Sequence, residues 1–226
     1  MNARPIIMQA ESVRGTIAGT KTMTRRVVRD AILDGNLFES VGWPCTASPL
    51  ACFLTRGPCS REPSAGEAHV YWTSGHHGII RCPYGAPGDR LWVRETLKAM
   101  RGVGGLGPIS HYVYAADDGR VRRRPDLDPV FSEAMTFAEF FRPDTIVSIH
   151  MPRWASRLTL EVVGVRVERL QAITEEDAVA EGCTGGETET PTEQYARLWD
   201  SVNGRRPGCR WDESPWVWIV AFRRLP

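Results

Sequence analysis

The sequence lacks the features that mark several large classes of protein. No apolar run approaches the ~20 residues that a membrane-spanning helix needs, and no charged-then-apolar leader opens the chain. Six cysteines in 226 residues are too few for a disulfide scaffold. We therefore expect a cytoplasmic protein with reduced thiols and no membrane partner.

An excess of charge of one sign is also missing. The formal net charge is only +1, so no protein-wide field draws the chain onto nucleic acid. Arginines cluster locally, at Arg25, Arg26 and Arg29 and again within 120–124. The second cluster is typical of a solvated loop, so only the first contributes to the site that we predict below.

Sequence signatures of well-known enzyme and metal sites are absent as well. There is no glycine-rich phosphate loop, no Ser-His-Asp order and no paired metal carboxylates. Zinc sites favour two to four residues between paired ligands, whereas most cysteines and histidines of the first half are spaced further apart. These residues are Cys45, Cys52, Cys59, His69, His76, His77 and Cys82. We predict no metal and no other cofactor, and whether this Cys- and His-containing insertion binds zinc stays open.

Local patterns predict a short strand, a short helix and a turn near the start and middle of the chain. Residues 5–8 are typical of a strand, and 11–18 of a helix that ends at Gly19 in a left-handed conformation. Residues 87–89 form a turn before a strand over 90–95. We predict that Asp89 braces this turn, a structural role.

The clearest pattern lies in residues 145–226. A strand over 158–167 is predicted to carry a bulge at Gly164. Thr174 and Thr190 are typical helix starts, and the chain ends in an apolar strand over 215–222. Residues 30–80 and 100–144 look irregular and are interpreted as two long insertions. The pattern predicts an α+β fold, a small barrel with short helices, in a single domain over 1–226.

The segment Gly19 to Arg26 gathers the groups that could carry chemistry. A lysine, threonines and paired arginines stand between a helix stop and a strand. Such groups suit a phosphate or a carbonyl-bearing ligand, although surface arginines and strand threonines explain the spacing equally well.

Four segments, in the same order along the chain, resemble the ASCH family of PUA-like β-barrels, and the similar regions (4–29, 85–97 and 155–226) cover about half of the chain. Residues 82–95 and 149–157 are also similar to a subgroup found in phage and prophage genomes, which implies a bacterial host cytoplasm. The matching features are Gly19, Lys21 and Arg26 in a G-x-K-x-x-x-x-R pattern, Gly88-Asp89 followed by Leu91-Trp-Val, the I-T helix of 173–182, and the C-terminal strand.

The resemblance implies a PUA-like barrel of five or six strands and a site for a nucleobase. The family includes amidohydrolases that remove the acetyl group from acetylcytidine with a Lys, a Thr three positions later and a Glu on the I-T helix. Here those positions are Lys21, Thr24 and Glu181. Thr24 would be the nucleophile or position a water, Lys21 the base, and Glu181 the proton donor.

Further residues are candidates for substrate binding. Arg25, beside Arg26, adds a second positive group that favours a phosphate-bearing ligand. Tryptophans interleaved with arginines suit base stacking with phosphate contact. These are Trp92, Arg94, Arg153 and Trp154. The expected partner is a nucleoside or a single-stranded nucleic acid, RNA in preference to DNA.

Three functions stay open at this stage, and so does the oligomeric state. The first is a hydrolase that acts on an acylated cytidine or cleaves RNA, because the family also includes reported ribonucleases. The second is a non-catalytic module that recognises a modified or flipped base. The third is a phage structural or interaction protein that uses the barrel as a scaffold.

Overall fold

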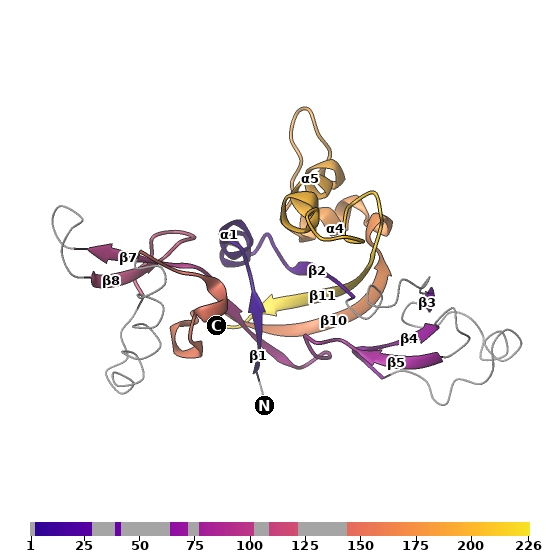
Figure 1. Ribbon diagram of the computed structural model, residues 1–226, viewed down its shortest axis with the longest axis horizontal. Coiled ribbons are helices and arrows are strands. Elements are labelled where there is room, and N and C mark those ends of the chain that lie inside the picture. The colour runs from indigo at the N-terminus through magenta and orange to yellow at the C-terminus, as the bar shows by residue number, and fades with distance from the viewer. Residues whose placement is uncertain (1–2, 29–38, 42–63, 72–76, 102–108, 122–143) are drawn as a thin grey trace, which may run out of the picture. The chain divides into compact units, whose positions relative to one another are not determined.

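The structure is a computed structural model that describes residues 3–28, 39–41, 64–71, 77–101, 109–121 and 144–226. It is an α+β fold in which strands outnumber helices, as predicted (Figure 1). The chain divides into two compact units, each made of separate segments. Unit 1 contains 1–19, 90–160 and 224–226, and unit 2 contains 20–89 and 161–223.

The largest sheet has five strands in the order β1-β6-β10-β11-β2. β1 pairs with β6 in parallel, and β11 pairs with β2 antiparallel. Within the part of the chain that the structure describes, no pairing of β1 with β2 closes this sheet into a barrel. The strands are β1 (Ala3–Ile7), β2 (Met23–Val27), β6 (Arg90–Arg94), β10 (Thr159–Arg169) and β11 (Trp216–Arg224).

Strand β10 crosses from unit 1 into unit 2 and changes its pattern of burial on the way. Leu160 and Val162 are buried, and after Gly164 the buried residues are Val165 and Val167. The alternation therefore shifts by one residue between Val162 and Val165. An extra residue at the predicted bulge would produce this shift.

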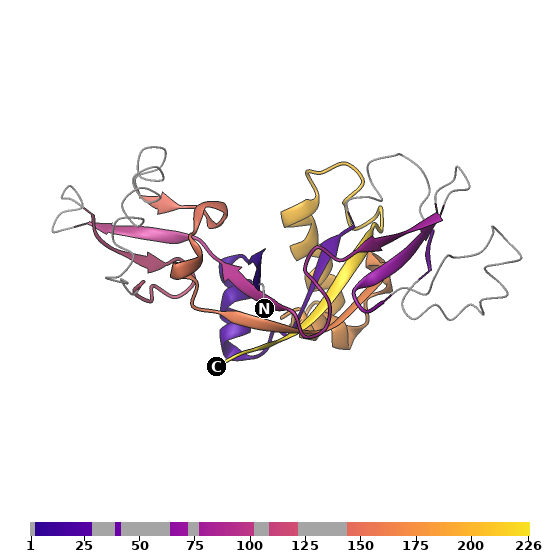
Figure 2. The same ribbon diagram turned by 90° about the horizontal axis from the view of Figure 1, so that it is seen from below.

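In unit 2, two helices cover one face of β2 and β11, which run side by side (Figures 1 and 2). The helices are α4 (Glu175–Ala180) and α5 (Pro191–Asn203). Both start as predicted, since Thr174 caps α4 and Thr190 forms a capping box with Glu193. The core between helices and strands comprises Met23, Leu170, Ile173, Ala178, Cys183, Tyr195, Trp199, Val217 and Ile219.

In unit 1, helix α1 (Ala10–Ala18) follows β1 and ends at Gly19, whose φ of 80° confirms the left-handed stop. A second sheet has the order β8-β7-β9. Part of it lies in 100–144, so the prediction of an irregular insertion there is wrong for its described residues. The elements are β7 (Leu97–Arg101), β8 (Ile109–Tyr114), β9 (Thr145–Ile146), and the 3-10 turns η3 (Ser148–His150) and η4 (Arg153–Ala155).

The first predicted insertion, 30–80, also contains regular structure. Its described part holds most of an antiparallel sheet of β3 (Glu39–Val41), β4 (Glu67–Tyr71) and β5 (His77–Arg81). Strands of three to five residues are too short to show a periodic pattern among glycines and prolines. Cys45, Cys52, Cys59, His76, Arg29 and 122–124 lie outside the described residues.

The turn before β6 is built as predicted. The Ala86 amide donates to the Asp89 carboxylate at 3.0 Å, and the Asp89 amide donates to the Ala86 carbonyl at 2.9 Å. Gly85 has a φ of 100°, and a side chain there would collide with Asp89. The last 3-10 turn, η5 (Leu170–Ala172), links β10 to α4. Within the described ranges, no helix is long and apolar enough to cross a membrane.

Candidate functional site: a buried lysine–glutamate pair

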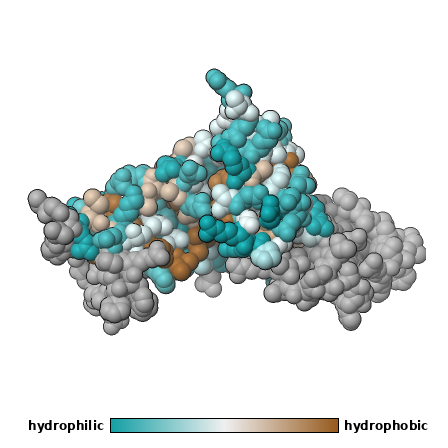
Figure 3. Space-filling model, turned by 45° about the horizontal axis from the view of Figure 1, so that its top comes forward, coloured by the Kyte–Doolittle hydropathy of each residue, from teal (hydrophilic) through white to brown (hydrophobic). Residues whose placement is uncertain are grey.

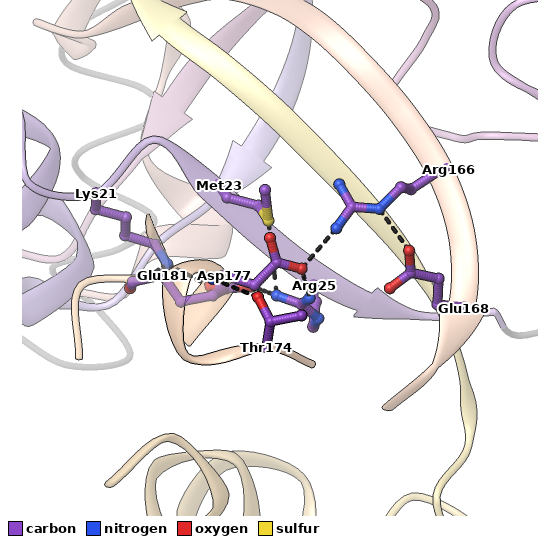
Figure 4. Close-up of polar contacts among 8 residues, drawn as sticks. All are labelled: Lys21, Met23, Arg25, Arg166, Glu168, Thr174, Asp177 and Glu181. Carbon is purple, nitrogen blue, oxygen red and sulfur yellow. Dashed lines mark hydrogen bonds and ion pairs between the residues drawn. The ribbon is translucent and has the colours of Figure 1, made fainter. Parts of the chain in front are cut away.

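Lys21 and Glu181 form a buried ion pair in unit 2, although 160 positions separate them. Lys21 lies in the loop before β2, and Glu181 is the C-cap residue that directly follows α4 (Figure 4). The Lys21 Nζ atom lies 2.6 Å from Glu181 Oε2 and 2.7 Å from the Glu181 carbonyl oxygen. Both residues are 5% exposed. The chain has only two lysines, Lys21 and Lys98. Lys21 is therefore not one of many lysines spread over the surface, and its burial is a specific feature.

The end of helix α4 fixes this pair through the main chain. Gly182 takes a φ of 94°, and the amides of Gly182 and Cys183 bond back to Val179 and Ala178. This is the hydrogen-bond pattern of a Schellman motif. The Thr22 amide donates to the Ala180 carbonyl at 2.9 Å, which ties the lysine loop to the helix end.

Arg25 contacts the same carboxylate from β2. Its guanidinium pairs with Asp177, lies over the ring of Tyr195 at 5.9 Å, and has Nη1 3.5 Å from Glu181 Oε1. Its side chain is 0% exposed. We expected Arg25 to offer a positive group to a phosphate. Instead, the face of β2 that carries it is covered by α4 and α5, and the arginine supports the ion pair.

The pair is the inner end of a chain of alternating charges, drawn in Figure 4. From the partly exposed end inward its members are Glu168, Arg166, Asp177, Arg25, Glu181 and Lys21. Arg166 lies 2.6 Å from Glu168 and 2.5 Å from Asp177. Three cations and three anions thus balance one another, which is what lets charged groups persist away from water.

One oxygen of the pair is not satisfied. Glu181 Oε1 is buried and accepts no hydrogen bond, and the Arg25 nitrogen at 3.5 Å is too far away to donate one effectively. A buried acceptor without a donor costs about 1–3 kcal/mol, so such atoms are rare and call for an explanation. An atom of this kind can accept a hydrogen bond from a bound ligand or water.

Tyr195 adds a neutral donor close to the pair. Burial, and then the negative charge of Glu181, raises the pKa of Tyr195 well above its usual value. The phenol therefore stays protonated throughout the neutral pH range and can only act as a neutral hydrogen-bonding group there.

Thr24 does not join Lys21 and Glu181. Met23 and Arg25 touch each other on the helix-covered face, with Met23 Sδ 3.6 Å from Arg25 Nη1. Successive side chains of a strand point to opposite faces, so Thr24 and Arg26 lie on the other face. Arg26 accordingly stacks over Tyr84 at 5.9 Å. Of the three predicted catalytic residues, the structure brings together two.

The remaining candidates belong to unit 1, whereas the Lys21–Glu181 pair belongs to unit 2. Arg94 lies 5.3 Å from the centre of the Trp92 ring and donates to the Ile149 carbonyl. Trp154 packs against the core of the β7–β8 sheet, and Arg153 is exposed on η4. The role of Trp92, Arg94, Arg153 and Trp154 as substrate contacts stays a prediction.

Several members of the site were not recognised in the sequence. Asp177, Tyr195 and Arg166 were not among the candidate residues. The i and i+4 spacing of Asp177 and Glu181 was a usable signal, since it places both carboxylates on one helix face. On the face shown in Figure 3, the surface over α4 and α5 is mainly hydrophilic. No cluster that could hold a metal occurs in the described residues.

Comparisons with known proteins returned no match, whether to models of protein families, to curated proteins or to solved structures. The resemblance to the ASCH family therefore stays a prediction from the sequence motifs.

Proposed function

We propose that this protein is a hydrolase of the ASCH type with a PUA-like barrel, which cleaves the amide of an acylated cytidine. One observation carries the proposal. The buried Lys21–Glu181 pair joins two of the residue types expected at the working positions, and it keeps a carboxylate oxygen without a hydrogen bond. A purely structural ion pair gains stability when all its acceptors are filled.

The placement of Thr24 favours water over this hydroxyl as the nucleophile. Glu181 Oε1 would take a proton from the attacking water as its oxygen adds to the acyl carbon. An ammonium has three donors, and Lys21 uses two of them on Glu181. The third is left to stabilise the negative charge on the acyl oxygen. The C–N bond then breaks, and Glu181 returns the proton to the exocyclic nitrogen, which gives cytidine and acetate.

The test measures the conversion of acetylcytidine to cytidine by chromatography. Glu181→Gln and Lys21→Met should each lower kcat about a hundredfold or more, as expected when a base or a charged donor is lost. Thr24→Ala should change kcat only a few-fold. If Thr24 is the nucleophile, which is one of the two roles that the sequence suggested, the kcat of Thr24→Ala should instead fall about a hundredfold.

The other lysine supplies a matched control. Lys98 is exposed and pairs with Asp118, so Lys98→Met removes the same charge without touching the pair and should leave kcat unchanged. Absence of turnover by folded wild-type protein, on acetylcytidine and on other acylated cytidines, would rule out the proposed reaction.

A binding module is the second candidate, and the position of Thr24 favours it, because no hydroxyl nucleophile from β2 reaches the pair. In that case folded protein should bind the modified cytidine without turnover, and Glu181→Gln should abolish binding. Binding of an uncharged nucleoside should barely depend on salt.

Cleavage of a labelled oligoribonucleotide in the same assay, lost in both Glu181→Gln and Lys21→Met, would instead indicate a ribonuclease.

A further inference from the structure

The two faces of the β1–β6 strand pair in unit 1 differ sharply. Ile6, Leu91 and Val93, on the inner face, are 0–1% exposed. The register sets Pro5 beside Trp92 and Ile7 beside Arg94, and alternation places all four on the outer face. With Arg90, two positions before Trp92, and the neighbouring Ile149, they form what we call the Arg-Trp strip.

The strip combines positive charge with aromatic and aliphatic surface. Arg90, Trp92 and Arg94 follow at every second position of β6, about 7 Å apart. Arg90 is exposed, and Ile7 and Ile149 are 40% and 55% exposed. Neither β1 nor β6 contains an aspartate or glutamate, so no carboxylate of these strands neutralises the arginines.

The contacts of Arg94 hold the centre of the strip in place. Its guanidinium lies 5.3 Å from the centre of the Trp92 ring and donates to the Ile149 carbonyl, while its Nε is buried without a hydrogen bond. An arginine anchored beside a tryptophan in this way presents a fixed cation next to an aromatic ring. This is the combination on which bases stack while phosphates meet positive charge.

Other partners fit this surface less well. β1 is the end strand of the sheet, but Pro5 in its centre has no amide hydrogen, which opposes pairing with a further strand. Double-stranded nucleic acid would offer phosphates to the arginines but would hide the base faces from Trp92. Charge and aromatic surface together are complementary to unpaired, stackable bases on a polyanionic backbone.

We propose that the Arg-Trp strip binds single-stranded nucleic acid, with a base stacked against Trp92 and phosphates at Arg90 and Arg94. This surface is formed within unit 1 and does not depend on hydrolysis at the Lys21–Glu181 pair.

The test is fluorescence anisotropy of a short labelled single-stranded oligoribonucleotide with the full chain at several salt concentrations. Trp92→Ala should weaken binding about 5- to 150-fold, the scale of one lost stacking contact, and Trp92→Phe should retain most of it. Arg90→Ala should reduce the slope of log K against log salt concentration by about 0.7, the value for one phosphate of a single strand.

Arg4→Ala is the matched control, because Arg4 lies on the same strand pair but, by alternation, on the opposite face beside Leu91. It should change affinity much less than Arg90→Ala. Lys21→Met should leave affinity unchanged, which separates this test from that of the proposed hydrolase. Circular dichroism checks that each variant is folded.

Four outcomes would overturn the proposal. They are the absence of binding at low salt, equal binding by wild type, Trp92→Phe and Trp92→Ala, equal competition by a duplex, and equal competition by polyglutamate. The last would point to an acidic protein partner. Self-association that requires Trp92, measured by sedimentation without oligonucleotide binding, would likewise assign the strip to a second copy of the chain.

Discussion

Glu95 in unit 1 and Glu181 in unit 2 are both buried beside a cation, and the two glutamates differ in how completely hydrogen bonds satisfy them. In unit 1, Glu95 is 2% exposed and both its oxygens accept from Arg157, each at 2.9 Å. Arg157 also stacks over Tyr114 at 3.9 Å and bonds Asp117 at 2.8 Å. In unit 2, Glu181 is equally inaccessible, but its Oε1 accepts nothing.

The chemistry of the partner explains the difference. An arginine presents a planar fork that fills both oxygens of a carboxylate, whereas a lysine is a point charge that serves one. Burial raises the pKa of Glu95, and the hydrogen bonds from Arg157 oppose that rise. The comparison teaches that burial of a charged pair does not by itself mark a site. The acceptor without a hydrogen bond is the feature on which we base the proposed site, because a structural pair gains nothing from such an atom.

The largest expected effect comes from breaking the Glu95–Arg157 pair, which we call the saturated pair because both Glu95 oxygens accept a hydrogen bond. Arg157→Ala leaves the Glu95 carboxylate buried without its donors, so the free energy of unfolding should fall by about 3–5 kcal/mol. Chemical denaturation measures it. Lys98→Ala, which removes one member of an exposed ion pair, should have almost no effect. Equal losses in the two variants would mean that the Glu95–Arg157 pair carries no structural role.

A smaller effect on the free energy of unfolding, of opposite sign, is expected when both residues of the Lys21–Glu181 pair are replaced together. Lys21→Met combined with Glu181→Leu removes two buried charges and one unsatisfied acceptor, while Arg25 keeps Asp177. The free energy of unfolding should stay or rise by about 1–2 kcal/mol, and hydrolysis of acetylcytidine should vanish. Glu181→Leu alone should destabilise, since it leaves Lys21 buried and unpaired. A loss above about 2 kcal/mol in the double variant would make this pair as structural as the first.

The smallest effect concerns Asp117 at the rim of the saturated pair. The hydrogen bond from Arg157 lowers the pKa of Asp117 below its usual 3.8. Its contribution to stability is therefore complete above pH 3.8 and lost as the pH falls through the lowered value. Asp117→Asn should reduce stability by well under 1 kcal/mol at neutral pH, because solvent screens this exposed group. Denaturation at several pH values should show the difference from wild type shrinking below about pH 4. A difference that persisted at low pH would exclude this ionisation as its cause.

Local sequence patterns predicted most of the helices and long strands. The starts at Thr174 and Thr190 and the stops at Gly19 and Gly182 were predicted correctly, because the hydrogen bonds that define them join residues a few positions apart. Short strands such as β3 and β8 were missed. Their pairing energy comes from neighbouring strands rather than from their own three to six residues.

For the candidate site, the sequence singled out Lys21 and Glu181, which the structure brings together, but not the arrangement of the residues around them. The twofold period of β2 was enough to separate Thr24 and Arg26 from Arg25, yet we expected all three at one ligand. Period alone says which side chains share a face, and only the docking of α4 and α5 decides which face the helices cover.

What the sequence by itself determined is therefore the local frame: where helices begin and end, which residues alternate along strands, and which motifs resemble a known family. Only the tertiary structure brought Lys21 to Glu181 across 160 positions and turned Arg25 inward onto Asp177. It also left Glu181 Oε1 without a donor. These contacts depend on strand order and on how the helices pack, which are set by the sum of many long-range interactions that no local stretch of sequence contains.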